Sequence, residues 1–212
     1  MQGIAWADIP ATISNPFHPP QPGSDYPHQG VDFADTGAGE IALTGRVVQA
    51  VMEGQVAAVI VNRFPYGNAL LVESPVERIP ASWLEALNLP APVPTLEAIP
   101  ALTCPLGEPV EYDPQKRSIY LLYAHMEALP TLEPGQKVLC GQAIGTVGMS
   151  GNALNPHLHL EMRIAPAGIQ LESMAHYDNS ATAQEMANYC LWRVNGLFQL
   201  VDPMQLWSLE NP

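Results

Sequence analysis

The apolar segments in the first third of this chain are short, and glycine or proline separates them. Residues 46–50, 54–61 and 68–73 are rich in Val, Leu and Ala, with Gly54 and the turn Pro65-Tyr66-Gly67-Asn68 between them. A strand needs only about five residues, whereas a helix needs about ten or more. Together with the tight turns, this spacing predicts an antiparallel sheet built from hairpins.

The same pattern returns in the second half of the chain. Residues 118–125, SIYLLYAH, are mostly apolar and predict a central strand that is buried on both faces. Residues 133–148 contain two short strand segments bounded by glycine turns, and they lead into a further strand that begins at His157. The fold class predicted from these segments is mainly β.

Two stretches interrupt the strand pattern and are predicted to be insertions. Eight prolines lie between Pro80 and Pro114, which excludes a central strand there, and a short helix is expected at 82–87. The second stretch contains Thr182-Ala183-Gln184-Glu185, a capping box that predicts a helix running to Leu191. We therefore expect one domain over residues 1–212, with a long proline-rich insertion at about 75–117 and a short helical one at about 164–190. Residues 192–203 are interpreted as a hairpin that turns at Asn195-Gly196.

The composition narrows the possible partners and the cellular address. A formal charge of −13 argues against nucleic acid as a partner, because such proteins need a basic patch. The chain contains no apolar run of about 18 residues, so no membrane span is predicted. The opening MQGIAWADIP has neither a basic region nor a long apolar one, so no signal peptide is visible. The cysteines at 104, 140 and 190 form no CxxC pair and are interpreted as buried small hydrophobic residues, with one disulfide as the alternative.

A pair of histidines is the strongest candidate for chemistry. His157-Leu158-His159 begins a strand-like alternation, and residues i and i+2 of a strand point to the same face about 7 Å apart. Two imidazoles in this arrangement can bind a metal ion together, or one can bind the metal while the other acts on its water. Two solvated strand histidines would look the same, and spacing alone does not decide which of the pair is a ligand.

Other histidines give weaker signals. His28 and Asp32 lie four residues apart on a segment that Pro27 and Gly30 make extended, and both residue types are good zinc ligands. His125 closes the apolar strand at 118–125. His18 is interpreted as a loop histidine and His176 as a surface histidine.

Taken together, four segments resemble the M23 family of zinc metallopeptidases, of the lysostaphin and LytM type. They are HQGVD at 28–32, YAH at 123–125, the glycine-punctuated GQKVLCGQAIGTVG at 135–148, and SGNALNPHLHLE at 150–161. The closing VNGLFQLVDP also fits. The resemblance covers about 15–74, 118–163 and 190–205, and it implies the antiparallel sheet domain of the LytM, or duplicated-hybrid-motif, type.

The resemblance implies a role for each site residue. His28, Asp32 and His159 would bind one zinc ion, and His125 and His157 would lie around the water that it activates. One of these two histidines would act as general base and the other would stabilise the oxyanion. The implied substrate is a peptide bond in the cross-links or stems of bacterial peptidoglycan, and the implied location faces the cell wall. Without a visible signal peptide, a cytoplasmic location stays open.

Two departures from the family pattern are mild: Asn155-Pro156 replaces a small glycine-containing turn, and Leu160 stands where Phe is common. The insertions are larger departures, because they can reshape the groove. Three alternatives therefore stay open: a non-catalytic M23-like module that regulates another wall hydrolase, a zinc peptidase acting on a non-wall peptide, and a biotinyl- or lipoyl-type carrier domain. A carrier needs a lysine at a hairpin tip, whereas Lys137 lies within a predicted strand.

Overall fold

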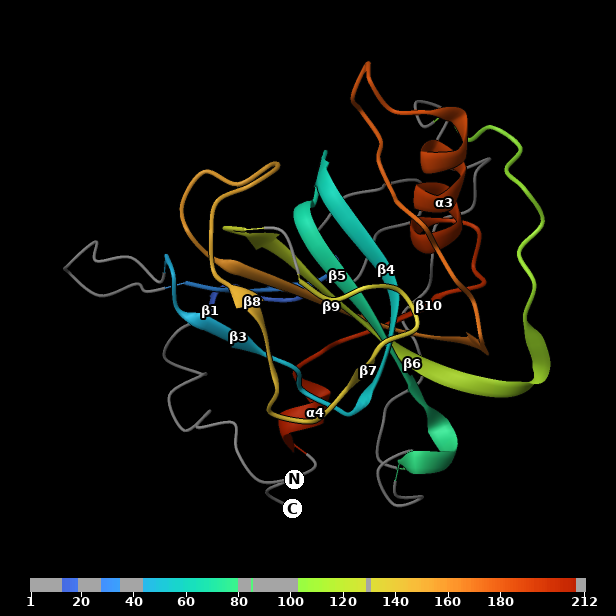
Figure 1. Cartoon of the computed structure of the whole chain (residues 1–212), viewed down its shortest axis with the longest axis horizontal. Coiled ribbons are helices and arrows are strands. Elements are labelled where there is room, and N and C mark those ends of the chain that lie inside the picture. Colours follow the sequence, from blue (N-terminus) through green and yellow to red (C-terminus); the bar gives the residue numbers. More distant parts are fainter. Residues whose placement is uncertain are drawn as a thin grey trace.

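The computed structural model describes residues 13–18, 28–34, 44–79, 85, 103–128 and 131–208. The predicted short helix at 82–87 and the chain start therefore lie almost entirely outside the described residues. The described part is built mainly from antiparallel strands with one longer helix (Figure 1), which confirms the predicted fold class. Within these residues, no helix has both the length and the apolar composition needed to cross a bilayer.

One large sheet forms the centre of the molecule. Its strands follow the order β1 (Ile13–Asn15), β2 (Val31–Phe33), β9 (Leu158–Ala167), β6 (Asp113–Met126), β5 (Gly67–Pro75), β4 (Gly54–Arg63) and β7 (Lys137–Val138). The short strand β10 (Gln199–Val201) pairs with β9 beyond the end of β2. A second, two-stranded sheet joins β3 (Val47–Gln49) to β8 (Ala143–Thr146). The strands predicted at 46–50, 54–61, 68–73 and 118–125 are all present.

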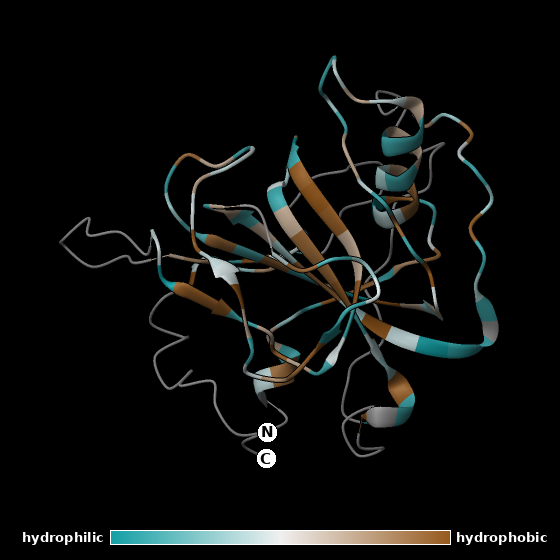
Figure 2. Ribbon diagram, viewed as in Figure 1, coloured by the Kyte–Doolittle hydropathy of each residue, from teal (hydrophilic) through white to brown (hydrophobic). Residues whose placement is uncertain are grey.

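The central strands are apolar on both faces because each face of the sheet is covered. Along β6, Tyr123 packs in one cluster together with Val48 and Ile144 of the two-stranded sheet. Its neighbour Leu122 packs in the opposite cluster together with Trp192 of the helix α3 (Ala183–Arg193). Figure 2 shows that β6 is hydrophilic at its first residues and hydrophobic where it runs through the covered part of the sheet. Burial on both faces therefore explains why the period-two alternation is weak here.

Helix α3 begins as the sequence predicts. Thr182 accepts a hydrogen bond from the backbone N–H of Glu185, and the Glu185 side chain accepts one in return from the backbone of Thr182. Glu185 also accepts a hydrogen bond from Arg63 Nε at 2.6 Å, which ties the start of the helix to the end of β4. The short helices η2 (Val76–Arg78) and α4 (Gln205–Ser208) complete the regular structure.

Three sequence interpretations are wrong. The region around Asn195-Gly196 is not a two-stranded hairpin, because α3 continues to Arg193 and only β10 is a strand there. Cys104 and Cys190 form a disulfide across 86 residues, so the preferred interpretation as free thiols is wrong for these two and the alternative of one disulfide holds; Cys140 forms no disulfide. His176 is buried, and its Nε2 lies 2.7 Å from the Thr103 carbonyl oxygen. Both features arise because residues 103–104 run beside α3, a contact that no local pattern encodes.

Candidate metal centre

The site is built on the alternation of β9. Leu158, Leu160 and Met162 point into the core cluster shared with β2 and β3. The residues between them, among which are His159 and Glu161, point to the opposite face, as period-two geometry requires. On one side of β9, Asp32 of β2 lies directly opposite His159. On the other side, Ala124 of β6 occupies the same position. The register of three strands therefore brings the HxxxD, YAH and HLH segments together.

Three atoms that can bind a metal ion, from His28, Asp32 and His159, lie close together. His159 Nδ1 lies 2.8 Å from Asp32 Oδ1 and 3.0 Å from His28 Nε2. His28 Nε2 lies 2.9 Å from Asp32 Oδ1. Zinc ligands sit at about 2.0–2.2 Å from the metal, so neighbouring ligand atoms of a tetrahedral site are about 3.3 Å apart. The triangle in this structure is close to that size, and its residue types are those that zinc prefers.

Hydrogen bonds behind the imidazoles direct the two nitrogens toward this point. His28 Nδ1 lies 3.1 Å from the carbonyl oxygen of Pro16, which can only accept, so the proton of a neutral His28 sits on Nδ1 and Nε2 is free to bind a cation. His159 Nε2 lies 3.1 Å from Glu161 Oε1 in the same relationship. A carbonyl or carboxylate behind a histidine is the usual support of a metal ligand. The donor set therefore fits a zinc ion.

A β-bulge positions His125. Asn68 pairs with Met126 and Leu70 with Tyr123, so one residue of β5 faces two residues of β6 at this point. His125 has φ of 62°, in the left-handed region, and its side chain turns toward the site. Its Nδ1 donates to the Ser150 carbonyl oxygen at 2.8 Å, which leaves Nε2 as an acceptor. Bulges often redirect a side chain beside an active site.

His157 has a matching arrangement. Its Nδ1 donates to the Asn155 carbonyl oxygen at 2.7 Å, and its Nε2 lies 3.6 Å from Asp32 Oδ1. The rings of His157 and His125 are 4.7 Å apart between centroids, and the His125 ring is 5.7 Å from that of His159. All five residues selected from the sequence thus lie in one cluster, whereas His18 is exposed and His176 lies elsewhere, beside Thr103.

The electrostatics of the cluster follow from burial and from these contacts. Burial lowers the pKa of His125 to about 3, assisted by the charges of His159 and His157, so this imidazole is neutral. For Asp32, burial raises the pKa, but the polar contacts and positive charge of His159 and His28 outweigh it and hold the pKa well below its usual range. Burial also lowers the pKa of His159, but hydrogen bonds to Asp32 and Glu161 raise it to about 9. Without a metal, a proton on His159 therefore occupies the centre of the triangle.

This proton gives a testable pH dependence. Because folding raises the pKa of His159 above about 6.5, the proton stabilises the metal-free protein fully below pH 6.5. That stabilisation is lost as the pH rises through about 9. We expect the free energy of unfolding of chelator-treated protein to fall by about 3 kcal/mol between pH 6.5 and 9.5. Urea titrations across this range measure it, with His159→Gln as the control that gives a flat profile. An equal slope in the variant would contradict the assignment.

Gly30 makes room for the His159 ring. A Cβ at this position would lie 2.6 Å from the Leu160 carbonyl oxygen and 2.7 Å from His159 Cε1. We expect Gly30→Ala to displace the ring, to weaken zinc binding at least tenfold and to destabilise the fold by about 1–3 kcal/mol. Calorimetric zinc titration and thermal unfolding measure the two effects. In the control Gly135→Ala, where a Cβ meets nothing within 4 Å, only stability should fall, because φ is +83°. Unchanged zinc affinity in Gly30→Ala would show that the ring does not depend on this glycine.

Sequence reasoning missed the support of His159. Glu161 is fully buried and accepts from Tyr66 Oη at 3.0 Å and from Trp192 Nε1 at 2.8 Å, besides facing His159. The signal was present as a carboxylate two residues beyond His159, on the same face of a strand. The partner residues Tyr66 and Trp192 carry no local signal, because their proximity depends on the packing of α3.

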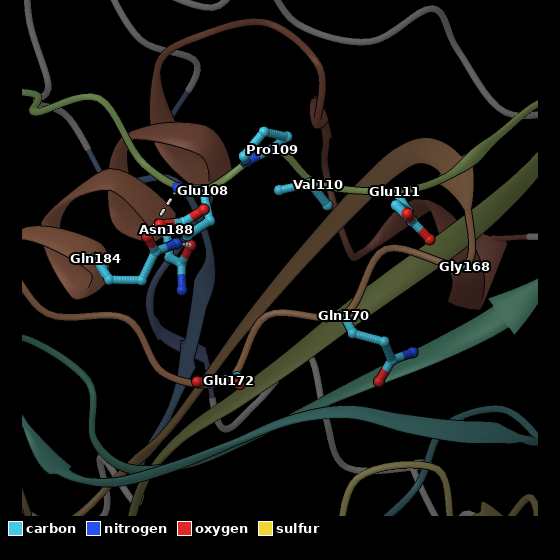
Figure 3. A pocket seen from close by; sticks show the side chains of 9 residues that line it. All are labelled: Glu108, Pro109, Val110, Glu111, Gly168, Gln170, Glu172, Gln184 and Asn188. Atoms are coloured by element: carbon cyan, nitrogen blue, oxygen red, sulfur yellow. Dashed lines mark hydrogen bonds between the residues drawn. The ribbon is translucent and has the colours of Figure 1, made fainter.

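A separate hollow lies beside the first half of α3 (Figure 3). Its volume is about 410 Å³, and six of its nine lining residues have polar side chains, three of them glutamates; the lining is Glu108, Pro109, Val110, Glu111, Gly168, Gln170, Glu172, Gln184 and Asn188. None of the five clustered site residues contributes to it. Gln184 accepts a hydrogen bond from the backbone of Glu108 at 2.8 Å and bonds to Asn188 at 2.9 Å. These contacts join the segment around Glu108 to the first half of α3, away from the last turn of the helix.

Comparison with solved structures gives several distant matches. One is a mutant catalytic domain of the prophage-encoded M23 protein EnpA from Enterococcus faecalis, with 20% identity over 74% of this chain and 82% of that chain and a TM-score of 0.42. Another is the catalytic domain of the antimicrobial peptidase lysostaphin from Staphylococcus simulans, with 18% identity over 92% of this chain and 90% of that one and a TM-score of 0.44. A third is a zinc-containing peptidase from Vibrio cholerae, with 23% identity and a TM-score of 0.40. The match covers 71% of this chain and 32% of that one.

A family model gives a match at the level of the sequence. The model of peptidase family M23 matches residues 105–171, which include β6, β8 and most of the site: His125, His157 and His159. His28 and Asp32 lie outside the matched range, and the structure places them against it through the pairing of β2 with β9. The resemblance of this chain to peptidase family M23 is therefore confirmed, and residues 105–171 carry it.

Proposed function

We propose that this chain is a zinc metallopeptidase that hydrolyses peptide bonds in the cross-links or stems of bacterial peptidoglycan. The observation that carries the proposal is the convergence of His28 Nε2, Asp32 Oδ1 and His159 Nδ1 within 2.8–3.0 Å of one another, with His125 and His157 beside them. Three protein ligands with room for a further group are typical of catalytic zinc rather than structural zinc. The family match supports the reaction class.

His28, Asp32 and His159 would hold the metal ion. Zinc, when bound, acts as a Lewis acid that makes water acidic enough to react near neutral pH and polarises the scissile carbonyl. Asp32 and His28 are 13% and 18% exposed, so a ligand can reach them from solvent. His157 and His159 are more deeply buried, and their orientation is therefore fixed by the strand and by their hydrogen bonds.

The remaining two histidines handle protons and charge. In both, the Nδ1 proton is donated to a backbone carbonyl, so Nε2 can accept a proton from the attacking water. The same nitrogen then returns the proton to the leaving amine. The partner imidazole, when its Nε2 has taken up a proton from solvent, donates a hydrogen bond to the oxygen that becomes negatively charged. Single variants of His125 and His157 assign the two roles, through the pH dependence of their residual activity.

One further observation supports a substrate outside the cytoplasm. The Cys104–Cys190 disulfide is typical of proteins in oxidising compartments. The net charge of −13 means that a wall polymer carrying negative charge must be recognised by the shape of a groove rather than by charge. We infer that the protein acts on peptide in or near the cell wall.

Digestion of purified peptidoglycan by zinc-loaded protein tests the proposal. Mass spectrometry of the products should show new amine termini that identify the bond, and His157→Ala should remove them while zinc stays bound. A polymer left intact by wild-type protein that has bound zinc would overturn the wall substrate. A panel of soluble peptides, run in parallel, then separates a peptidase with a different substrate from a non-catalytic module.

A further inference from the structure

We propose that helix α3 is part of the metal centre. Its residues Trp192 and Arg193 hold the carboxylate of Glu161, and Glu161 in turn holds the His159 imidazole in the tautomer and orientation that a metal ion requires. The inference rests on the metal site of the proposed function, but not on its peptidase activity. It gives the helical insertion a role as a source of positioning residues.

The hydrogen bonds around Glu161 fix its role. Arg193 Nη1 donates to Oε1 at 3.0 Å, and Trp192 Nε1 donates to Oε2 at 2.8 Å. From the sheet, Arg163 Nη2 donates to Oε2 at 3.0 Å and Tyr66 Oη donates to Oε1 at 3.0 Å. Indole and guanidinium groups can only donate, so Glu161 must accept from both sides.

The tautomer of His159 follows from this arrangement. Since Glu161 is surrounded by donors, it offers only lone pairs to His159 Nε2, which must therefore carry a proton. In a neutral imidazole, the other nitrogen, Nδ1, then has a free lone pair. That nitrogen is the one that faces His28 and Asp32, so the support from α3 determines which atom of His159 is available to a metal.

A second contact joins the same network to the other ligand segment. Arg163 is completely buried, with its guanidinium 4.7 Å above the Trp192 ring. Its Nη2 also donates to Oε1 of Gln29, the residue after His28, at 2.6 Å. Removing Trp192 or Arg193 would therefore disturb a group that lies between the segments carrying His28 and His159. A buried network of this kind is sensitive to the loss of any one member.

The last turn of α3 makes these contacts, whereas residues of its first half line the hollow. Trp192 and Arg193 follow Tyr189 by three and four residues, and the Tyr189 ring lies 6.1 Å from that of Tyr66. Gln184 and Asn188 line the hollow and lie one to two turns before Trp192 in the helix. The helix therefore offers a matched control, because Gln184→Ala changes the same element without touching Glu161.

The test measures metal affinity, with Co²⁺ as the probe and its visible spectrum as the readout, followed by competition with Zn²⁺. We expect Glu161→Gln to weaken binding 10- to 100-fold, and Trp192→Phe and Arg193→Met to weaken it about tenfold. The d–d bands of bound Co²⁺ should also change shape, because the ligand geometry changes. Arg193→Lys should recover part of the affinity, and Gln184→Ala should stay within twofold of wild type.

The outcomes separate this inference from the proposed function. If Trp192→Phe and Arg193→Met fold, as circular dichroism and thermal unfolding show, and bind Co²⁺ like wild type, then α3 does not position His159. Trp192→Phe keeps a large aromatic ring in the core, so this variant is expected to fold even if Glu161→Gln does not. If wild type binds metal and the variants bind weakly but peptidoglycan is not cut, the peptidase proposal fails and the positioning role stands. If wild type binds neither Co²⁺ nor Zn²⁺, both fail.

Discussion

His28→Ala should lose tight zinc binding, with affinity reduced at least about a thousandfold. His28 supplies one of the three converging donor atoms, at 2.9 Å from Asp32 Oδ1 and 3.0 Å from His159 Nδ1. Without it, two protein ligands remain, which is fewer than catalytic zinc sites use. Competition against a chromophoric chelator measures the affinity, and metal analysis after dialysis gives the stoichiometry. Activity should fall with metal content.

The control for this variant is His18→Ala. His18 lies in the same N-terminal part of the chain and its backbone N–H donates to the His28 carbonyl oxygen at 2.9 Å, but its side chain is exposed. This variant should bind zinc as wild type does. Equal loss of zinc in both variants would mean that the segment as a whole, and not the His28 imidazole, determines binding. Unchanged zinc binding in His28→Ala would overturn the assignment of this ligand.

The double variant Cys104→Ala/Cys190→Ala should be less stable than wild type by about 2–4 kcal/mol. The disulfide closes a loop across 86 residues, so it restricts the unfolded chain strongly. It also fastens the segment at 103–104 to α3, where Cys190 is buried. Guanidinium titration under non-reducing conditions measures the loss of stability.

Cys140→Ser is the matched control, because Cys140 lies outside the disulfide and its Sγ donates a hydrogen bond to the Val51 carbonyl oxygen at 3.3 Å. It should change stability by less than about 1 kcal/mol. Reduction of wild type with dithiothreitol should reproduce most of the effect of the double variant. Equal stability of the reduced and oxidised proteins would show that the cross-link does not stabilise the fold.

The sequence predicts the strands well because their boundaries are local. Gly54 and the Pro65–Asn68 turn mark where the strands around them begin and end, and the segments between these turns are too short for helices. The capping box at Thr182 starts α3 where expected. The end of α3 is different. Asn195-Gly196 is a strong turn signal and predicts a strand on each side, whereas the burial of Trp192 and Val194 against the sheet keeps the chain helical to Arg193. Tertiary packing thus overrides the local preference.

The clustering of the site residues was predictable, but its support was not. The family resemblance selects five residues, and the pairing of Asp32 with His159 and of Ala124 with His159 places them in one cluster. Glu161 could be placed on the same strand face from its spacing alone. The contacts of Trp192 and Arg193 with it could not, because they join residues about thirty positions apart through a helix whose packing has no motif.

The distance along the chain between the converging donor atoms has a thermodynamic consequence. His28 and His159 are separated by 131 residues, so the unfolded chain retains only local pairs as chelators, such as His28 with Asp32 and His157 with His159. Zinc should therefore bind the folded state almost exclusively, and the stabilisation should equal RT ln(1 + [Zn]/Kd). At a free zinc concentration one hundred times Kd, this amounts to about 2.7 kcal/mol. The melting temperature of the protein would then report the free zinc concentration around it.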